Sequence, residues 1–136
     1  MTSEQKSLVQ STFNEVLPIA DKAAAMFYAR LFEIDPSLKP LFKTDLKEQG
    51  EKLMQTLHVA VKGLDKLDEL IPALEALGKR HKTYGVKNEH YATVAQALLW
   101  TLEKGLGEKY TKDVAAAWTS VYTIVADVMT KAASKN

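Results

Sequence analysis

The sequence predicts an all-α fold of about seven helices, and three features of the chain support this prediction. Ala, Leu, Lys and Glu dominate, and the apolar residues recur with the 3.6-residue period of a helix. Alternating runs of β-branched residues, which would indicate strands, do not occur. Pro and Gly stand where helices are expected to begin or end. A chain of 136 residues is expected to form a single domain, residues 1–136, around one hydrophobic core.

The first part of the chain predicts two long helices and a short one. The first helix is expected over residues 3–17, with Thr2 or Ser3 as its N-cap, and a proline closes it. The second is expected over residues 19–34. Asp35 is then an N-cap, because Pro36 follows at the first helical position, where a missing N–H costs nothing. A short, tight helical segment should follow.

The middle of the chain predicts two more helices. A polar loop over residues 43–47 leads into the first of them, and Gly63 ends it. The next is expected over residues 67–83. Pro72 lies near its start, where a proline is tolerated, so one helix and a helix broken into two pieces are both open. Gly85 terminates the helix.

Two helices complete the predicted fold. Asn88 is expected to cap the first and Thr111 the second. Their apolar residues repeat at helical spacing and should face the core. These residues are Val94, Leu98, Leu102 and Leu106 in the first, and Val114, Trp118, Val121, Val125 and Val128 in the second.

Composition excludes several classes of function. Eighteen basic residues against seventeen acidic ones give a net charge of +1, and no basic block predicts nucleic-acid or anionic-membrane binding. The absence of cysteine excludes disulfides, thiolate metal sites, iron–sulfur clusters and a cysteine nucleophile. The polar N-terminus does not resemble a signal peptide, and no apolar run is long enough for a membrane span. A cytoplasmic protein is therefore expected.

His81 is the strongest candidate for chemistry, because it ends an otherwise apolar helical face. Leu70, Leu74, Leu77 and His81 follow one another at spacings of four, three and four residues. A neutral imidazole is the commonest protein ligand for a metal, and at the end of a leucine-lined face it would suit a flat, apolar, metal-bearing cofactor. The alternative is a core histidine that one hydrogen bond satisfies.

Other helical faces also carry polar or aromatic residues among apolar ones. Gln49 begins a stripe that continues through Leu53 and Leu57, and Tyr28 lies on an apolar face of the second helix. Phe42 follows the short helical segment. The alternatives are a boundary position for Gln49, a Tyr28 that reaches the surface, and a simple core role for Phe42.

Several short segments occur in a defined order and spacing along the whole chain. They are Phe27-Tyr28-Ala29-Arg30-Leu31-Phe32, Asp35-Pro36, Leu41-Phe42, Leu70-Ile71-Pro72-Ala73-Leu74, Gly78-Lys79-Arg80-His81, His90-Tyr91, Ala117-Trp118 and Val121-Tyr122. In this order they resemble the globin family, and in particular bacterial haemoglobins and the globin domain of flavohaemoglobins.

The resemblance implies a globin fold that encloses haem b (iron protoporphyrin IX). His81 would be the proximal ligand of the iron, and its other ring nitrogen would donate to a nearby acceptor. Tyr28 and Gln49 would lie on the distal side as hydrogen-bond donors, with Leu53 as the apolar distal wall. The other implied haem contacts are Phe42, Leu57, Leu77, Val86, Tyr91, Val94 and Leu98.

The function that the resemblance implies is binding of oxygen and other diatomic gases such as NO and CO, as in oxygen transport. Oxygen gains negative charge at ferrous iron, so two donors predict high affinity and slow release. The first alternative is a nitric oxide dioxygenase for NO detoxification, which would need a separate flavin/NAD(P)H reductase. Near Ala133 flavohaemoglobins carry a glutamate that this chain lacks, which argues against efficient turnover. The second alternative is a haem-free regulatory module.

Further expectations concern the ligands of the haem iron and the oligomeric state of the chain. His58 and His90 are poor ligand candidates, and no histidine stands at the distal position, so a bis-histidine haem is not expected. Tyr28 or Lys52 at the sixth coordination site of ferric haem is a separate hypothesis. The chain is expected to be a monomer or a weak homodimer, and primarily a ligand-binding protein with enzymatic activity left open.

Overall fold

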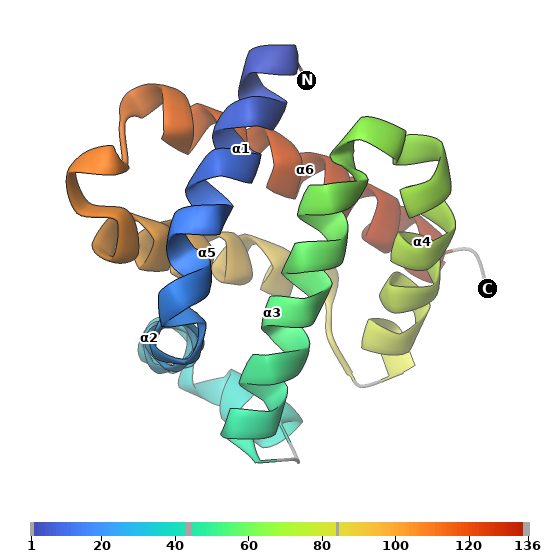
Figure 1. Ribbon diagram of the computed structural model, residues 1–136. Helices are drawn as coiled ribbons and strands as arrows, with labels where there is room; N and C mark the ends of the chain where they lie inside the picture. Colours follow the sequence, from blue (N-terminus) through green and yellow to red (C-terminus); the bar gives the residue numbers. More distant parts are fainter. Residues whose placement is uncertain (1, 43–44, 84, 135–136) are drawn as a thin grey trace.

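The computed structural model describes residues 2–42, 45–83 and 85–134, and its regular elements over these ranges are all helical, which confirms the predicted class (Figure 1). The 3₁₀ segment η2 and the six α-helices of this part of the chain correspond to the predicted helices. The elements are α1 (Ser3–Val16), η1 (Leu17–Ile19), α2 (Ala20–Ile34), η2 (Pro36–Leu41), α3 (Leu46–Lys62), η3 (Gly63–Lys66), α4 (Leu67–Thr83), α5 (Asn88–Leu106), η4 (Gly107–Lys109) and α6 (Lys112–Ser134).

Local capping explains where most helices begin. Thr2 forms a capping box with Gln5, in which each side chain accepts from the other's backbone N–H at 3.1 Å. At the start of η2, the side chain of Asp35 accepts a hydrogen bond from the backbone N–H of Ser37. At the start of α3, the side chain of Asp45 accepts one from the backbone N–H of Lys47. Thr111 accepts from a backbone N–H in the first turn of α6. The predicted caps at Thr2, Asp35 and Thr111 are therefore confirmed.

The structure settles the open question at Pro72, and it overturns the prediction of the α5 cap. Pro72 does not break α4, which continues from Leu67 to Thr83. The missing Pro72 N–H would have paired with the carbonyl of Asp68, an exposed residue near the helix start where water can replace the bond. The N-cap of α5 is Lys87 and not the predicted Asn88. The Lys87 N–H donates to Nδ1 of His90 at 3.0 Å, so His90 supplies the capping contact.

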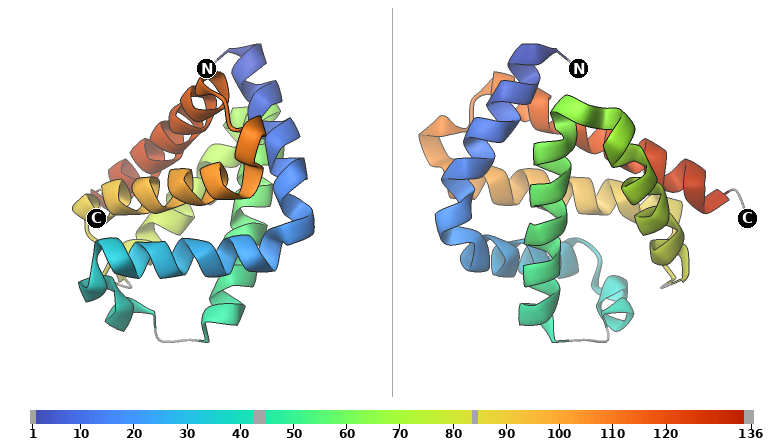
Figure 2. Two further views of the ribbon diagram at one scale, coloured as in Figure 1. Left: turned by 90° about the vertical axis from the view of Figure 1, so that its left-hand side faces the viewer. Right: turned by 45° about the vertical axis from the view of Figure 1, so that its right-hand side comes forward.

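The helices pack in pairs around a main core. α2 lies beside α5 and runs in roughly the opposite direction, while α6 packs against both α1 and α4 (Figure 2). Between α1 and α6 the indole Nε1 of Trp118 donates to Thr12 Oγ1 at 2.9 Å, and this hydroxyl donates to the carbonyl of Leu8 at 2.6 Å. The largest fully buried side chains are Trp118, Phe13, Leu31, Leu64 and Val9.

A second, smaller hydrophobic cluster joins α4 to α6. Its buried members are Leu70, Leu74 and Met129, and Leu77 and Tyr91 pack against them. α3 instead packs mainly on α2. α3 ends at the η3 corner and α4 begins there (Figure 1). The helix that carries Gln49 and the helix that carries His81 therefore meet at this corner but are supported by different parts of the fold.

Candidate functional site

A close crossing of α2 and α3 brings two of the predicted site residues together. Gly50 is buried, and a Cβ atom there would lie 2.9 Å from the Cβ of Ala24. This approach places Tyr28, one turn beyond Ala24, beside Gln49. The hydroxyl of Tyr28 donates to the backbone carbonyl of Gln49 at 3.3 Å. The contact involves the backbone of Gln49, whose side chain is half-buried.

Tyr28 is also the centre of an aromatic cluster. Phe42 contacts it edge-on, with ring centroids 5.3 Å apart, and Phe32 lies 5.4 Å from Phe42. Tyr28 is only 6% exposed, and this burial raises the pKa of its hydroxyl to about 12. The hydroxyl therefore stays protonated at neutral pH and remains a hydrogen-bond donor. The structure thus brings Tyr28, Gln49 and Phe42 into one region, and Tyr28 does not reach the surface.

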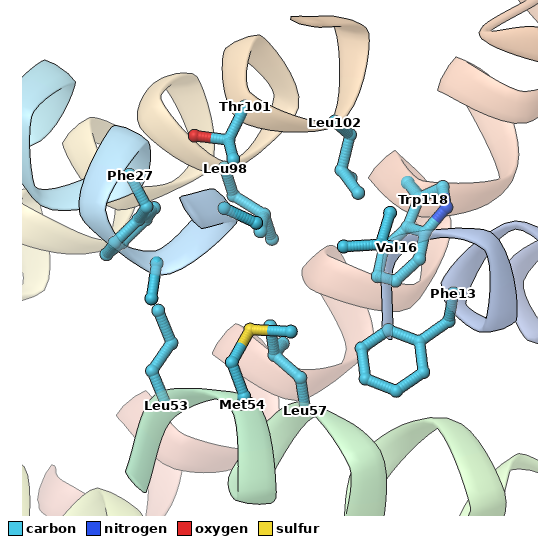
Figure 3. A pocket seen from close by; sticks show the side chains of 12 residues that line it. Phe13, Val16, Phe27, Leu53, Met54, Leu57, Leu98, Thr101, Leu102 and Trp118 are labelled. Atoms are coloured by element: carbon cyan, nitrogen blue, oxygen red, sulfur yellow. The ribbon is translucent and has the colours of Figure 1, made fainter. Parts of the chain in front are cut away.

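An apolar cavity of about 20 Å³ adjoins this region (Figure 3). Leu53 and Leu57 line it from α3, together with Met54, and Leu98 lines it from α5. The hydroxyl of Thr101, a polar group in the lining, is already bonded to a carbonyl of its own helix at 2.8 Å. The volume suits one molecule about the size of water, and the lining has little to offer a polar occupant.

His81 lies in the last turn of α4, where its backbone is held by a glycine-terminated helix end. The N–H of Val86 donates to the carbonyl of His81, and the N–H of Gly85 donates to that of Lys82, both at 3.0 Å. Gly85 adopts a φ of +95°, which favours glycine, so the predicted terminator is confirmed. The imidazole Nδ1 lies 2.9 Å from the carbonyl of Leu77. Both the backbone and the ring of His81 are thereby oriented.

The environment of His81 favours its neutral form. Burial lowers the pKa of His81 below the usual 6.5, the hydrogen bond to Leu77 opposes this shift, and the positive charge of Arg80 lowers the pKa further. Because Nδ1 faces a carbonyl, the neutral ring carries its proton on Nδ1 and a lone pair on Nε2. This tautomer is the one that binds a metal through Nε2.

Tyr122 has a structural role that the sequence did not reveal. Its hydroxyl donates to the backbone carbonyl of Tyr91 at 2.6 Å and so ties the start of α5 to α6. Burial, with a smaller effect of Tyr91, raises the pKa of Tyr122. Tyr91 and Leu77 pack on the same cluster around Met129. Only the Val121-Tyr122 pair in the family pattern pointed to this residue.

Most of the other predicted contact residues are apolar and only partly buried. Leu98 is buried, and Val94 packs against the main core. The half-buried apolar members of the predicted set are Phe42, Leu53, Leu57, Leu77, Val86 and Val94. Apolar surface of this kind suits a flat apolar cofactor, which would cover what these side chains expose.

The other side chains considered as iron ligands are His58, His90 and Lys52. His58 packs against the ring of Phe13, with centroids 6.0 Å apart, and His90 caps α5. Lys52 is exposed. Over residues 2–42, 45–83 and 85–134, no group of three or more His, Cys, Asp or Glu side chains could hold a metal ion. His81 is therefore the candidate metal ligand that the sequence analysis leaves.

An all-α domain with one oriented, neutral histidine beside half-buried apolar side chains is typical of haem-binding helical proteins. A model of the globin family matches residues 25–129, and the chain belongs to this family. The chain is also similar to the neuroglobins of Tetraodon nigroviridis and Danio rerio, at 29% identity over 150 aligned positions in each case. The alignments cover 100% of this chain and 94% of each relative, and neuroglobin-1 of Oncorhynchus mykiss gives the same values.

These relatives are vertebrate neuroglobins, so they support the globin part of the predicted resemblance and not its bacterial or flavohaemoglobin part. Globins bind haem and, through it, diatomic gases. In this chain His81 could supply a nitrogen ligand to such a cofactor, and the half-buried apolar side chains could supply its walls. None of the described helices combines the length and the apolar character needed to cross a membrane.

Proposed function

We propose that this chain holds haem b with His81 as the axial ligand of the iron and reversibly binds oxygen and other diatomic gases. The observation that carries this proposal is the state of His81. Its Nδ1 lies 2.9 Å from the Leu77 carbonyl, and burial keeps the ring neutral, so Nε2 has the lone pair that the iron requires. Haem supplies the iron at which the gas ligand binds.

The distal donors are Tyr28 and Gln49, and their arrangement supports a high oxygen affinity. The Tyr28 hydroxyl donates to a neutral carbonyl at 3.3 Å, which is a long hydrogen bond for an O–H donor. A ligand with partial negative charge is a stronger acceptor than a neutral carbonyl, so the hydroxyl would gain by turning to it. The amide of Gln49 would provide the second donor, with Leu53 as the apolar wall.

The chain would act as a single globin domain. The family match over residues 25–129 of a chain of 136 supports the single domain. A cytoplasmic monomer or weak homodimer with a role in oxygen transport is part of the same proposal.

Nitric oxide dioxygenation is a second candidate function, favoured by the same Tyr28 donor. This reaction would convert NO and oxygen to nitrate with consumption of one electron per turnover, which a separate flavin/NAD(P)H reductase would have to supply. The last turns of α6 have alanine at position 133, which weakens this candidate relative to reversible gas binding.

Absorption spectra of the purified protein in ferric, ferrous and oxygen-exposed states test the proposal. A strong Soret band and an oxygenated spectrum that reverts under vacuum are expected. Rapid oxidation on each exposure to oxygen would contradict reversible binding, and nitrate formation with NO and a reductase would favour the second candidate. The absence of a Soret band after addition of hemin would favour a haem-free regulatory module.

A further inference from the structure

Gly78 marks the point at which the backbones of α4 and α6 come into direct contact. It is buried, and a Cβ atom placed on it would lie 2.3 Å from the carbonyl oxygen of Met129 and 2.7 Å from its Cα. Both atoms belong to the backbone of α6, so they cannot swing aside as the end of a side chain could. Any residue larger than glycine at this position would therefore force one of the two helices to move.

The contact lies on the face of α4 that is seated on α6. Leu70 and Leu74 precede Gly78 at spacings of four residues, and both belong with Met129 to the second hydrophobic cluster. Met129 is only 5% exposed. α6 is also the helix against which α4 packs most extensively. The leucines hold α4 on α6, and Gly78 determines how closely the two helices approach.

His81 follows Gly78 within the same helical turn. Three residues correspond to about 4.5 Å along the helix axis and about 60° around it, so His81 lies on the flank of the face that contacts α6, and its Cα moves with Gly78. The ring is fixed to α4 by the Leu77 carbonyl and the backbone by the Val86 N–H. A displacement of α4 at Gly78 would therefore be passed to the imidazole.

We propose that Gly78 is a positioning residue for the metal ligand: its missing side chain lets α4 rest directly on the backbone of α6 and so sets where the His81 imidazole stands. This inference rests on the proposed haem binding. Gly78 touches neither the gas ligand nor the cofactor in this proposal and acts only through the helix that carries His81.

Gly78→Ala tests this role, with Gly105→Ala as the matched control. Gly105 also lies inside a helix, but a Cβ atom there would meet its nearest neighbour, Cδ1 of Ile19, at an ordinary 3.5 Å. In the ferrous protein without gas ligand, resonance Raman spectroscopy reports the iron–histidine stretching frequency. We expect this band to shift in Gly78→Ala and to stay in place in Gly105→Ala. Transfer of hemin to an excess of apomyoglobin should be faster in Gly78→Ala by about tenfold.

A second pair of variants separates positioning of His81 from a general distortion of the pocket. In His81→Gly, free imidazole can occupy the ligand position without attachment to α4. In this background Gly78→Ala should leave the iron–imidazole band unchanged, because α4 no longer carries the ligand. A shift of equal size with the detached imidazole would overturn the inference.

The outcomes also distinguish this inference from the proposed function. No Soret band in the unmodified protein would remove haem binding itself. A normal Soret band with identical iron–histidine bands in the unmodified protein and Gly78→Ala would leave haem binding intact and overturn the role of Gly78. If Gly78→Ala does not fold, the comparison moves to Leu74→Ala against the unmodified protein, because loss of this buried leucine loosens the contact of α4 with α6 without a new atom at position 78. The same band shift is expected there, and its absence would again overturn the inference.

Discussion

The hydroxyl of Tyr28 donates to the backbone carbonyl of Gln49 at 3.3 Å and thereby links α2 to the first turn of α3. The two helices can come this close because Gly50 has no side chain to meet Ala24. The same crossing thus builds part of the core and places a buried donor beside the residue expected on the distal side. Since a phenol has one proton, a gas ligand and the Gln49 carbonyl would compete for it.

Tyr28→Phe should speed oxygen dissociation. The substitution keeps the aromatic contact with Phe42 and removes only the donor. A hydrogen bond to a charged acceptor contributes about 1.5–3 kcal/mol, so we expect dissociation to be at least about tenfold faster in stopped-flow measurements. Carbon monoxide carries less negative charge, and its dissociation should change less. Tyr110→Phe, at the corner before α6, is the control, and equal oxygen off-rates in Tyr28→Phe and the unmodified protein would exclude Tyr28 as the main donor.

Gly50→Ala should destabilise the protein through the crossing of α2 and α3. The new methyl group would lie 2.9 Å from the Cβ of Ala24, which is fixed to its backbone. We expect a loss of about 1–3 kcal/mol from overpacking, which outweighs the gain in helix propensity. Urea unfolding measures the change. Gly105→Ala, which has room, should instead be stabilised by up to about 1 kcal/mol.

The same crossing can be tested by exchange of its two residues. In Ala24→Gly/Gly50→Ala the two methyl groups no longer meet, so the double variant should be more stable than the sum of the single changes predicts. Strict additivity of the two free-energy changes would show that the contact between these residues does not limit the approach of α2 and α3.

Thr12→Val should weaken the seam between α1 and α6. Valine has nearly the same shape as threonine but cannot accept the hydrogen bond from Trp118 Nε1, which is 2.9 Å from Thr12 Oγ1. The buried indole N–H would then lack this partner, at a cost of about 1–3 kcal/mol in the free energy of unfolding. Thr12→Ser keeps the hydroxyl and should lose less. The reverse order of stability in thermal unfolding would contradict the role of this bond.

The stability of the haem-free protein should depend on pH through His81. Burial lowers the pKa of His81 in the folded state below the 6.5 of an unperturbed histidine. As the pH falls through 6.5, the unfolded chain takes up the proton first, and the free energy of unfolding decreases. The contribution is present in full above this pH. Urea unfolding from about pH 7.5 to 5 should therefore show a weaker pH dependence in His81→Gln, and identical profiles would contradict the assignment.

Much of the fold could be predicted from the sequence because its signals are local. The caps at Thr2, Asp35 and Thr111 and the terminator Gly85 act within a few residues, so helix ends follow from them. The effect of Pro72 stayed open, because it depends on whether the carbonyl that loses its partner lies near a solvated helix start. The stripe that ends at His81 likewise needed only helical periodicity.

The site was less predictable because its geometry depends on contacts between distant helices. Tyr28 and Gln49 could be assigned to apolar faces, but their bond depends on the crossing at Gly50. Tyr122 reaches Tyr91 across thirty-one positions of sequence, and no local pattern predicts that contact. Glycines inside helical patterns, at positions 50 and 78, were the available signals of close helix approach.

Titration of hemin into the purified haem-free protein, with His81→Ala and His58→Ala measured beside it, tests whether His81 holds the cofactor. We expect the unmodified protein and His58→Ala to give a sharp Soret band at one hemin per chain. His81→Ala should give a weak, easily lost complex, and added imidazole should restore the band. Equal hemin binding and equal spectra in all three proteins would contradict His81 ligation and with it the proposed function.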